Sequence, residues 1–428
     1  MSALIASLFT ILVFIRPQDW WSPLEGIPVV MVVGMLGAIF AVMKKNVISN
    51  HHTMLLFTLC LIGFISEVFN FYFAGAIAAI TKLLFSTALP FIVILGLAFT
   101  RKSKEFIFAT IIFAALTIVY NGYQQITLPS GIGWSGAEIL DQHGDLRIKF
   151  VGIFSDPNDV GLLFLMTIPL IFYFRETQNW IVRQISILSL VAIIYGIYLT
   201  NSRGTLLGVL ILIVLYLYKR YGKIVANVLV VSAIPVLLLV FSGFRSISAS
   251  EESAYGRLDA WYAGSQMLKS NPLFGTGLGG FLDNHHLTAH NTYVLCWSEL
   301  GVLGFLVWFS FLFSIIFMLH KISFSELQFS KEKLNVKKGI TEFEFNRCLL
   351  MSKVMFYSLC GYAIGVVFLS RLTFVPLYMF CAISVGLMQQ MNLFIDKPIK
   401  FTGQLFKKLC LVAFCVLIGI NLSLKFLL

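Results

Sequence analysis

The sequence contains 428 residues, of which 58% are hydrophobic and only 12% are charged. Its mean hydropathy of +0.89 is too high for a water-soluble domain, so the composition predicts a polytopic helical membrane protein. The net charge at pH 7 is +11. The seven cysteines lie within or at the ends of apolar runs and form no C-x-x-C pair, which favours small buried thiols over a disulfide framework or a zinc site.

Apolar runs separated by short polar segments predict about 12–13 transmembrane helices, because a span needs roughly 20 mostly apolar residues. We expect these helices to build an all-α fold with a single membrane domain over residues 1–428. The first run has neither a basic leader nor a small-residue cleavage site, so we interpret it as a retained span. The predicted spans are residues 2–15, 27–43, 53–70, 74–98, 106–120, 158–174, 185–200, 204–218, 224–241, 292–319, 348–369, 375–391 and 409–428.

The distribution of Lys and Arg along the chain predicts the orientation of these helices. Most basic residues lie in the connections that follow even-numbered spans. The positive-inside rule places these connections in the cytoplasm, so the positive charge is a topology signal and not a sign of nucleic-acid binding. The odd-numbered connections then face outside, and they include the loop at 121–157, the turn at 201–203, a long extracytoplasmic loop at 242–291 and the segment near Arg371.

Four polar motifs fall at the outer ends of the predicted spans. They are FSDPNDVG at 154–161, TNSRG at 200–204, the arginine that precedes DAWYAGSQML, and a His-Asn pair just before an apolar run. Polar residues at membrane depth are costly and usually face a cavity or a ligand, so we expect these motifs to converge on one outward-facing site. The candidate site residues are Asp156, Asn158, Arg203, Arg257, His290 and Asn291.

Two arginines are candidates for binding a phosphate group. Only a short turn separates Arg203 from the preceding span, so its guanidinium must lie at or just below the outer interface. Arg257 precedes an amphipathic run that could lie flat on the outer leaflet. The alternatives are a helix-anchoring arginine for Arg203 and a solvated loop residue for Arg257. Guanidinium groups are fork-shaped donors suited to phosphate or pyrophosphate, so the pair indicates a phosphorylated lipid.

Three histidines cluster before the tenth predicted span. His285, His286 and His290, with Asp283 nearby, could bind a metal only if a helix aligned them, and the neighbouring glycines do not predict one, so we expect no metal. We expect His285 and His286 to be mobile. His290 adjoins the span, where a partly buried imidazole could act as a general base near neutral pH. The alternative is a capping or interfacial histidine.

Two further features need an interpretation. The GTGLGG segment at 275–280 satisfies the G-x-G-x-x-G pattern, but no predicted strand precedes it, so we interpret its glycines as turn residues and not as a dinucleotide site. Glu67 and Lys82 lie in the third and fourth predicted spans. Because unpaired charges within a membrane are costly, we expect them to form an ion pair, with a substrate contact as the alternative.

Four segments carry a family resemblance when they are taken together and in order. They are IFSDPNDVGLLFLMTIPL, LTNSRGTLLGVLI, RLDAWYAGSQMLKSNPLFGTGLGGF and AHNTYVLCWSELGVLGFLVWF, which cover roughly residues 150–310. In this order they resemble the O-antigen ligase and polymerase superfamily of bacterial surface-glycan enzymes. The resemblance implies a metal-independent glycosyltransferase with a helical membrane fold and no cofactor.

The resemblance also implies roles for the candidate residues. Arg203 and Arg257 match the family's outer arginines and are expected to bind an undecaprenyl-pyrophosphate-linked glycan donor. His290 matches the family's histidine before a membrane helix and is expected to deprotonate the acceptor hydroxyl. The neighbouring polar residues, expected to contact the substrate, are Asp156, Asn158 and Asn291.

The acceptor remains open at this stage. Members of the superfamily polymerise repeat units, ligate a glycan to lipid A core, or transfer an oligosaccharide to protein. The stretch RPQDWWSPL near the start resembles members found with exopolysaccharide genes and favours a polymerase, which would have a chain-length regulator as a further partner. The alternative from another class is a transporter or flippase of lipid-linked glycans. We expect a bacterial cytoplasmic (inner) membrane protein whose active site faces the periplasm.

Overall fold

The computed structural model describes residues 2–44, 47–142, 144–177, 179–222, 224, 247–325 and 342–427. Among these residues, ten helices are long and apolar enough to cross a membrane, and two shorter apolar helices are also present. The all-α polytopic class is therefore confirmed. The span predicted at 224–241 lies outside the described residues beyond residue 224, as does the start of the predicted long loop at 242–246.

The helices and strands follow the chain in this order. The first part contains α1 (Ser2–Phe14), η1 (Pro17–Asp19), η2 (Ser22–Leu24), α2 (Val29–Val42), α3 (His51–Phe69), α4 (Phe73–Leu83), η3 (Leu84–Ala88), α5 (Leu89–Leu97) and α6 (Arg101–Thr127). The middle part contains β1 (Leu140–Gln142), β2 (Asp145–Arg147), η4 (Gly152–Phe154), α7 (Pro157–Thr177), α8 (Trp180–Thr200) and α9 (Arg203–Tyr221). The last part contains α11 (Ile247–Ser270), α12 (Phe281–Asn284), α13 (Thr292–Phe324), α15 (Glu342–Gly365), α16 (Val375–Met391) and α17 (Gly403–Leu427).

Each predicted span within the described residues coincides with helical structure. The fifth predicted span is longer than expected, because α6 covers 101–127 and so occupies the start of the predicted loop at 121–157. The rest of that loop contains the antiparallel hairpin of β1 and β2, which the sequence did not predict. Strands of three residues are too short to show an alternating pattern, so periodicity could not reveal them.

Side-chain caps explain where several helices begin. An Asn, Ser or Thr side chain that accepts a backbone N–H of the first turn satisfies a donor that the helix itself cannot pair. Such caps are provided by Asn50, Thr100, Asn179, Ser202 and Asn291. Two of these caps, at α9 and α13, lie beside candidate site residues.

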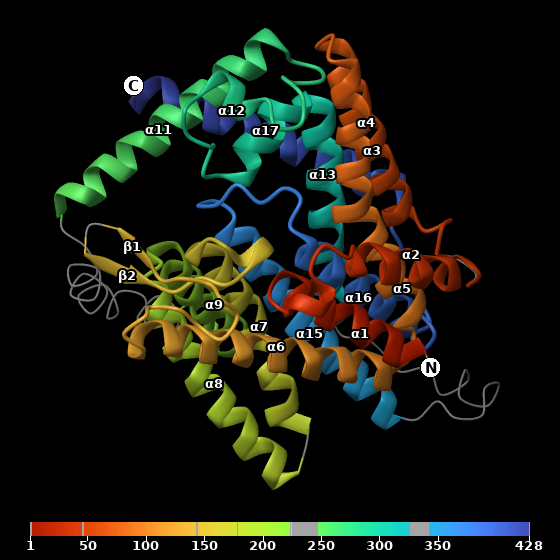
Figure 1. Cartoon of the computed structure of the whole chain (residues 1–428). Helices are drawn as coiled ribbons and strands as arrows, with labels where there is room; N and C mark the ends of the chain where they lie inside the picture. The colour runs from red at the N-terminus through yellow and green to blue at the C-terminus, as the bar shows by residue number, and fades with distance from the viewer. Residues whose placement is uncertain are drawn as a thin grey trace.

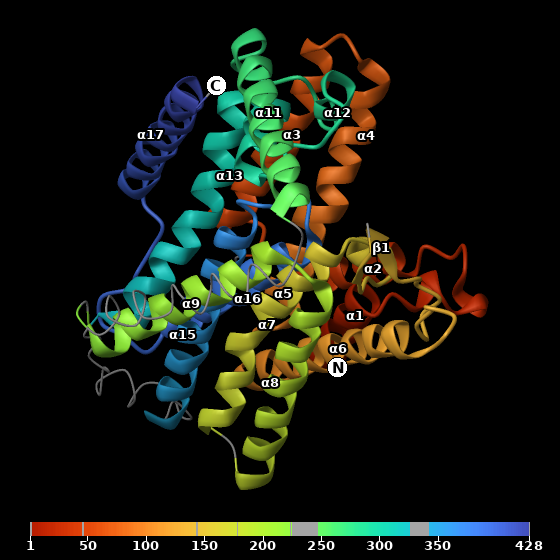
Figure 2. The same ribbon diagram turned by 90° about the vertical axis from the view of Figure 1, so that its left-hand side faces the viewer.

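The helices form two groups that meet near the middle of the molecule (Figures 1 and 2). In both views α3, α4, α11 and α17 lie at one end, and α6 and α8 lie at the other. Helix α7 packs against α8 and α15, whereas α13 packs against α3, α15 and α17. Helix α16 lies between α5 and α15, and each of its residues from 376 to 388 is buried. A helix that is apolar on all sides is stable when neighbours surround it, so α16 forms the centre of the core.

The long loop contains a regular helix and a tightly packed turn. Helix α11 packs against α13 and α17, so the amphipathic run after Arg257 is partly covered by protein. The segment after α11 is a turn, as predicted, since Gly275, Gly277 and Gly279 have left-handed φ angles of 72°, 97° and 101°. No strand precedes it, because the residues before it belong to α11.

This glycine-rich turn packs against a break in α13. The break occurs at Gly301, which has a φ of 65°. The break leaves backbone carbonyls of α13 without helical hydrogen-bond donors, and the turn provides two donors. The N–H of Thr276 donates to Ser298 O at 2.9 Å, and the N–H of Gly277 donates to Glu299 O at 3.1 Å. The glycines therefore allow two backbones to approach each other.

The predicted ion pair between Glu67 and Lys82 is wrong. Glu67 is buried, and its Oε1 atom accepts a hydrogen bond of 2.6 Å from the backbone N–H of Leu278 in the glycine-rich turn. Lys82 is exposed and forms no ion pair with any residue that the structure describes. Glu67 thus binds a backbone donor instead of a cation, and it holds the turn against α3.

The cysteines are free thiols, in agreement with the prediction that they form no disulfide framework. Four of them are buried, and Cys360 and Cys410 are partly buried. Cys415 is exposed on α17 and is therefore an exception to the predicted burial.

Candidate active site

The first part of the site is the start of α7. Asp156 precedes the helix, and its Oδ1 atom accepts the backbone N–H of Asn158 at 2.7 Å and the side-chain Nδ2 of Asn158 at 2.9 Å. Pro157 occupies the first helical position, where its missing N–H is not needed. Asp156 therefore caps α7 and also fixes the orientation of the Asn158 amide.

The Asn158 amide joins three separate segments. Its Oδ1 atom accepts hydrogen bonds from Arg147 Nη2 at 3.0 Å and from Ser202 Oγ at 2.7 Å. Arg147, on β2, also donates from Nε to the carbonyl of Thr200 at 3.1 Å. Arg147 is buried, and no sequence pattern singled it out. The only indication in the sequence was that Arg147 is a basic residue in a loop predicted to face outside.

The turn between α8 and α9 positions Arg203. Asn201 ends α8 in the left-handed conformation with φ 47°, and Ser202 then caps α9 by accepting the N–H of Thr205 at 3.3 Å. Arg203 is the first residue of α9 and is half-buried. The guanidinium therefore belongs to a helix N-terminus, where the unpaired N–H groups and the helix dipole also favour an anion.

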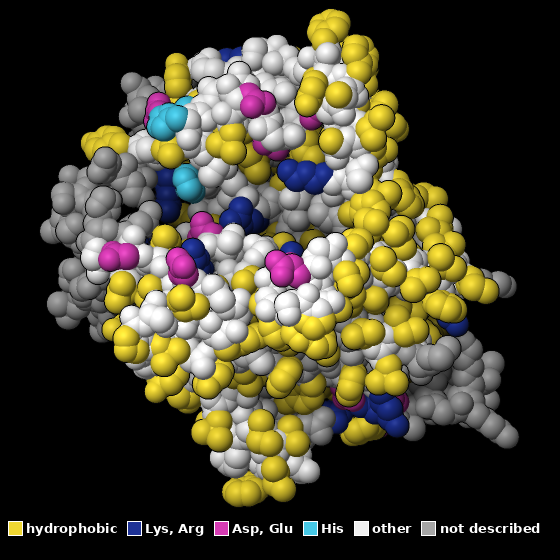
Figure 3. Space-filling model, in the orientation of Figure 1, with side chains coloured by type: hydrophobic (Ala, Val, Ile, Leu, Met, Phe, Trp, Pro, Cys, Tyr) yellow, Lys and Arg dark blue, Asp and Glu magenta, His cyan; other side chains and the backbone are white. Residues whose placement is uncertain are grey.

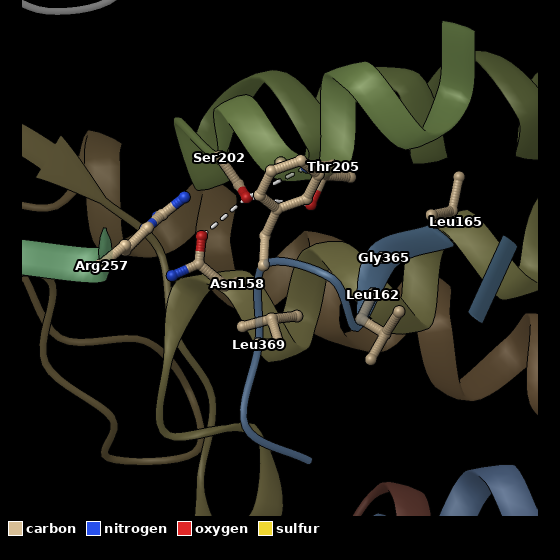
Figure 4. A pocket seen from close by; sticks show the side chains of 10 residues that line it. Asn158, Leu162, Leu165, Ser202, Thr205, Arg257, Gly365 and Leu369 are labelled. Carbon is tan, nitrogen blue, oxygen red and sulfur yellow. Dashed lines mark hydrogen bonds between the residues drawn. The ribbon is translucent and has the colours of Figure 1, made fainter. Parts of the chain in front are cut away.

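Arg257 approaches the same place from α11. Figure 4 shows its side chain directed toward Asn158 and Ser202, and its guanidinium lies 5.8 Å from the ring centre of Phe368. The pocket that these residues line has a volume of about 10 Å³, which is room for about one water molecule. The pocket is therefore too small to hold a sugar or a pyrophosphate.

His290 lies between a buried residue and a helix cap. The carbonyl of its neighbour Ala289 accepts the indole N–H of Trp261 at 2.9 Å, which ties this segment to α11. His290 has a left-handed φ of 47°, and its side chain is half-buried. Few non-glycine residues adopt this conformation, and such strained residues cluster at functional sites.

The charges around His290 favour its neutral form. Burial lowers the pKa of His290 below its ordinary value, and the positive charge of Arg257 lowers it further. The negative charge of Asp156 acts in the opposite direction, and Arg371 adds a second positive charge. Residues from the start of α7, from α11 and from the loop before α16 therefore all act on this imidazole. A neutral imidazole can accept a proton, which a general base must do.

Arg371 is a site residue that the sequence analysis placed outside the membrane but did not assign. It forms a bidentate ion pair with Asp159, which is almost fully buried in the first turn of α7. Its backbone N–H donates to Thr292 Oγ1 at 2.8 Å, and the Thr292 hydroxyl donates to the carbonyl of Leu369 at 2.6 Å. The loop before α16 is thus joined to the first turns of both α7 and α13.

Asn291 has a structural function in this arrangement. It is only 2% exposed, and its Oδ1 atom accepts the backbone N–H of Tyr293 at 2.9 Å and that of Val294 at 3.3 Å. These bonds cap α13 and occupy the side-chain oxygen. Asn291 therefore positions His290 beside it, and its predicted contact with substrate has no support from this geometry.

His285 is held in place, in contrast to the mobility that we expected from the glycines before it. Its Nε2 atom lies 3.0 Å from Asp259 Oδ2, and its ring contacts that of His286 at a centroid distance of 4.4 Å. Burial lowers the pKa of His285, but the hydrogen bonds to Asp259 and to the backbone of Leu287 raise it above the ordinary value. His285 is thus paired with an acid and differs from His290. Within the described residues, no group of three His, Cys, Asp or Glu side chains could hold a metal ion.

One face of the molecule has an open hollow (Figure 3). Figure 3 shows Lys and Arg side chains around this hollow, together with histidine and acidic side chains. Arg203, Arg257, His290 and Asp156 come from four segments that are far apart in the sequence. The fold brings Asp156 and Arg257 close to His290, and Ser202, which precedes Arg203, lines the pocket together with Arg257.

This fold and this site define a class: a helical membrane protein with a cationic, histidine-containing site at the ends of its spans. Residues 188–309 match the family model described as O-antigen ligase. The match includes Arg203, Arg257 and His290, so this part of the chain is similar to the O-antigen ligase family. No match to a curated relative was found.

Proposed function

We propose that the protein transfers a glycan from an undecaprenyl-pyrophosphate donor to an acceptor hydroxyl on the extracytoplasmic face of the inner membrane. The observation that carries this proposal is the placement of Arg257 near His290. The positive charge of Arg257 lowers the pKa of the His290 imidazole, so a neutral base lies beside a fixed cation. A base and a phosphate-binding group are the two parts that such a transfer needs. The proposal needs no metal and no cofactor.

In the proposed reaction, His290 takes the proton of the acceptor hydroxyl while the oxygen attacks the anomeric carbon of the donor sugar. The bond from that carbon to the pyrophosphate oxygen breaks, so the configuration at the carbon inverts. Negative charge then develops on the leaving pyrophosphate. Arg257 and Arg203 stabilise this charge, because cations fixed before the reaction need no reorganisation during it. The products are the extended glycan and undecaprenyl pyrophosphate.

Other residues of the site position these groups. Asp156 caps α7 and orients Asn158, which in turn binds Ser202 at the start of α9. Asn291 caps α13 directly after His290. We assign these residues positioning roles, because their hydrogen bonds hold the helix ends that carry Arg203 and His290.

We favour a polymerase, which uses a growing glycan as acceptor and works with a chain-length regulator. The second candidate is a ligase that transfers the glycan to lipid A core or to protein, and it is favoured by the description of the matched family. A lipid-linked glycan transporter is the alternative from another class. It would break no glycosidic bond.

The test is a transfer assay with purified protein in proteoliposomes and a defined undecaprenyl-pyrophosphate-linked repeat unit. We expect one undecaprenyl pyrophosphate to be released for each glycan transferred. A ladder of long glycans identifies a polymerase, and a single capped lipid A core identifies a ligase. Movement of the lipid-linked glycan across the bilayer without release of undecaprenyl pyrophosphate would contradict the proposal and support a transporter.

A further inference from the structure

A second cavity shares no lining residue with the pocket at Asn158 and Arg257. It has a volume of about 430 Å³ and lies between α1, α2 and the α4–η3–α5 segment. This volume falls within the roughly 300–1,000 Å³ that ligand pockets occupy. Its wall is mainly apolar, with two cations among the lining residues. The apolar lining includes Phe9, Val13, Val29, Val30, Met31, Phe85 and Leu89, and the cations are Arg16 and Lys82.

Lys82 is the first observation that points to a ligand. It lies within the apolar segment Phe73–Leu97, where a charge is costly and usually functional. Its side chain lines the cavity and forms no hydrogen bond or ion pair with any residue in the described part of the chain. Glu67 does not pair with Lys82, since it binds the backbone of Leu278, and the buried Glu299 interacts with Lys82 only through its charge, without an ion pair among the described residues.

The backbone beside Lys82 is the second observation. Residues Leu84–Ala88 form a π-helix, and the hydroxyl of Ser86 donates to the carbonyl of Lys82 at 2.6 Å. Phe85, within this π-helix, lines the cavity. Isolated π-helical turns are costly and occur frequently at functional sites, where they reorient side chains. Here the turn places an aromatic ring and a cation on the same wall.

Arg16 supplies the second positive charge on the cavity wall. Its φ is 54°, and its guanidinium pairs with Asp19 through Nε and through Nη2, the latter at 3.2 Å. The guanidinium packs so closely on the chain that a Cβ on Gly152 would lie 1.8 Å from Arg16 Nε. Asp19 balances Arg16, so Lys82 is the cation of this wall that has no ion pair among the described residues.

We propose that this cavity binds a lipid phosphate, with the hydrocarbon chain against the apolar wall and the phosphate between Lys82 and Arg16. Apolar lining is unsuited to a free inorganic anion, and cations are unsuited to a neutral lipid. The ligand is therefore an amphiphile with an anionic head. This chemistry is shared by a polyisoprenyl phosphate and by an anionic phospholipid. The cavity is a second lipid site, separate from the proposed pyrophosphate site at Arg203 and Arg257.

The test measures lipid binding by native mass spectrometry on the purified full chain in detergent, and it does not depend on glycan transfer. The probes are a polyisoprenyl phosphate, phosphatidylglycerol, phosphatidylcholine and inorganic phosphate. We expect the two anionic lipids to bind and phosphatidylcholine and inorganic phosphate not to bind. Whichever anionic lipid binds more tightly identifies the source of the ligand.

Variants assign the binding to this cavity. Lys82→Ala should weaken lipid-phosphate binding about tenfold or more, because a charge-assisted contact is lost, and Lys82→Arg should restore most of it. Met31→Trp, which fills the cavity without altering a charge, should weaken binding as well. Lys269→Ala, at an exposed position on α11, is the matched control and should leave binding unchanged.

Unchanged binding in both Lys82→Ala and Met31→Trp would overturn the proposal. If Lys82→Ala proved unstable, unchanged binding in Met31→Trp would overturn it. Equal binding of phosphatidylcholine would also overturn it, since the cations would then have no function. Glycan transfer that fails while lipid binding persists would count against the proposed enzyme activity but not against this site. Loss of binding in Arg257→Ala at the level of Lys82→Ala would place the lipid at the first site and contradict a second one.

Discussion

The charges around His290 lead to a pH dependence with a definite direction. As the base, His290 must be neutral, so kcat/KM should fall as the pH drops through the pKa of its imidazole. Burial and the charge of Arg257 lower that pKa, so the acid limb should have its midpoint below the ordinary histidine value of 6.5. Transfer rates measured between pH 4 and pH 8 test this. A midpoint above 6.5 would contradict it.

Two variants should move this midpoint in opposite directions. Asp156→Asn removes the negative charge that raises the pKa of His290, so the midpoint should move to lower pH, while asparagine can still cap α7. Arg257→Gln removes a positive charge that lowers this pKa, so the midpoint should move to higher pH. The pH profile of each variant gives the shift. Two shifts in the same direction would show that these charges do not act on the base.

Lysine substitution distinguishes a phosphate-binding arginine from an arginine that only anchors a helix end. Arg203→Ala should abolish transfer without lowering the amount of protein in the membrane, and Arg203→Lys should recover little, because a point charge cannot reproduce a bidentate phosphate contact. Arg257→Ala should weaken donor binding in a similar way. Full activity of either alanine variant would return that arginine to an anchoring function. The measurements are the transfer rate and the protein level in isolated membranes.

The sequence indicated candidate site residues only where they adjoin the end of a predicted helix. Arg203 and His290 adjoin predicted spans, so span boundaries alone placed them on one face. Arg147 and Arg371 were not assigned, because a hairpin and a loop bring them to the site through hydrogen bonds that no local pattern reveals. The same limit explains Glu67, whose partner is a backbone N–H far along the chain.

At the scale of elements, the break in α13 and the glycine-rich turn form one unit. A Cβ on Gly301 would lie 2.3 Å from the backbone of Leu273, and its φ of 65° is strained for other residues. Gly301→Ala should therefore destabilise the protein by about 1–3 kcal/mol, measured by thermal unfolding in detergent. Gly419→Ala on α17, with no atom within 4 Å of the added Cβ, is the matched control and should change stability by at most about 1 kcal/mol. Equal effects would contradict this account.

The elements themselves were largely predictable, because about 20 apolar residues between polar segments define a span. The exceptions have physical causes. The hairpin of β1 and β2 is too short for a pattern, and α11 continues through polar residues that a hydropathy argument treats as loop. The break at Gly301 was not predicted, since a glycine inside an apolar run is ordinary in a membrane helix.

At the scale of the whole molecule, the orientation in the membrane stays a prediction. Reporters fused at Lys223 or Lys337, which lie outside the described residues, should behave as cytoplasmic. A reporter at Ser250, in the first turns of α11, should behave as exported. The reason is the excess of Lys and Arg in the connections that follow even-numbered spans. Cytoplasmic behaviour of the Ser250 reporter would place the candidate site on the wrong face for a periplasmic transfer.

The central claim is that His290 acts as a lone base beside a separate donor-binding group. The most direct measurement is the single-turnover transfer rate of His290→Ala, made together with its affinity for the lipid-linked donor. We predict a rate lowered by about 10²–10⁴-fold with unchanged donor affinity, whereas His286→Ala and EDTA-treated wild type keep most of their rate. If His290→Ala keeps its rate, the base is another group. If His290→Ala, His286→Ala and EDTA all abolish transfer, a metal site replaces the lone base.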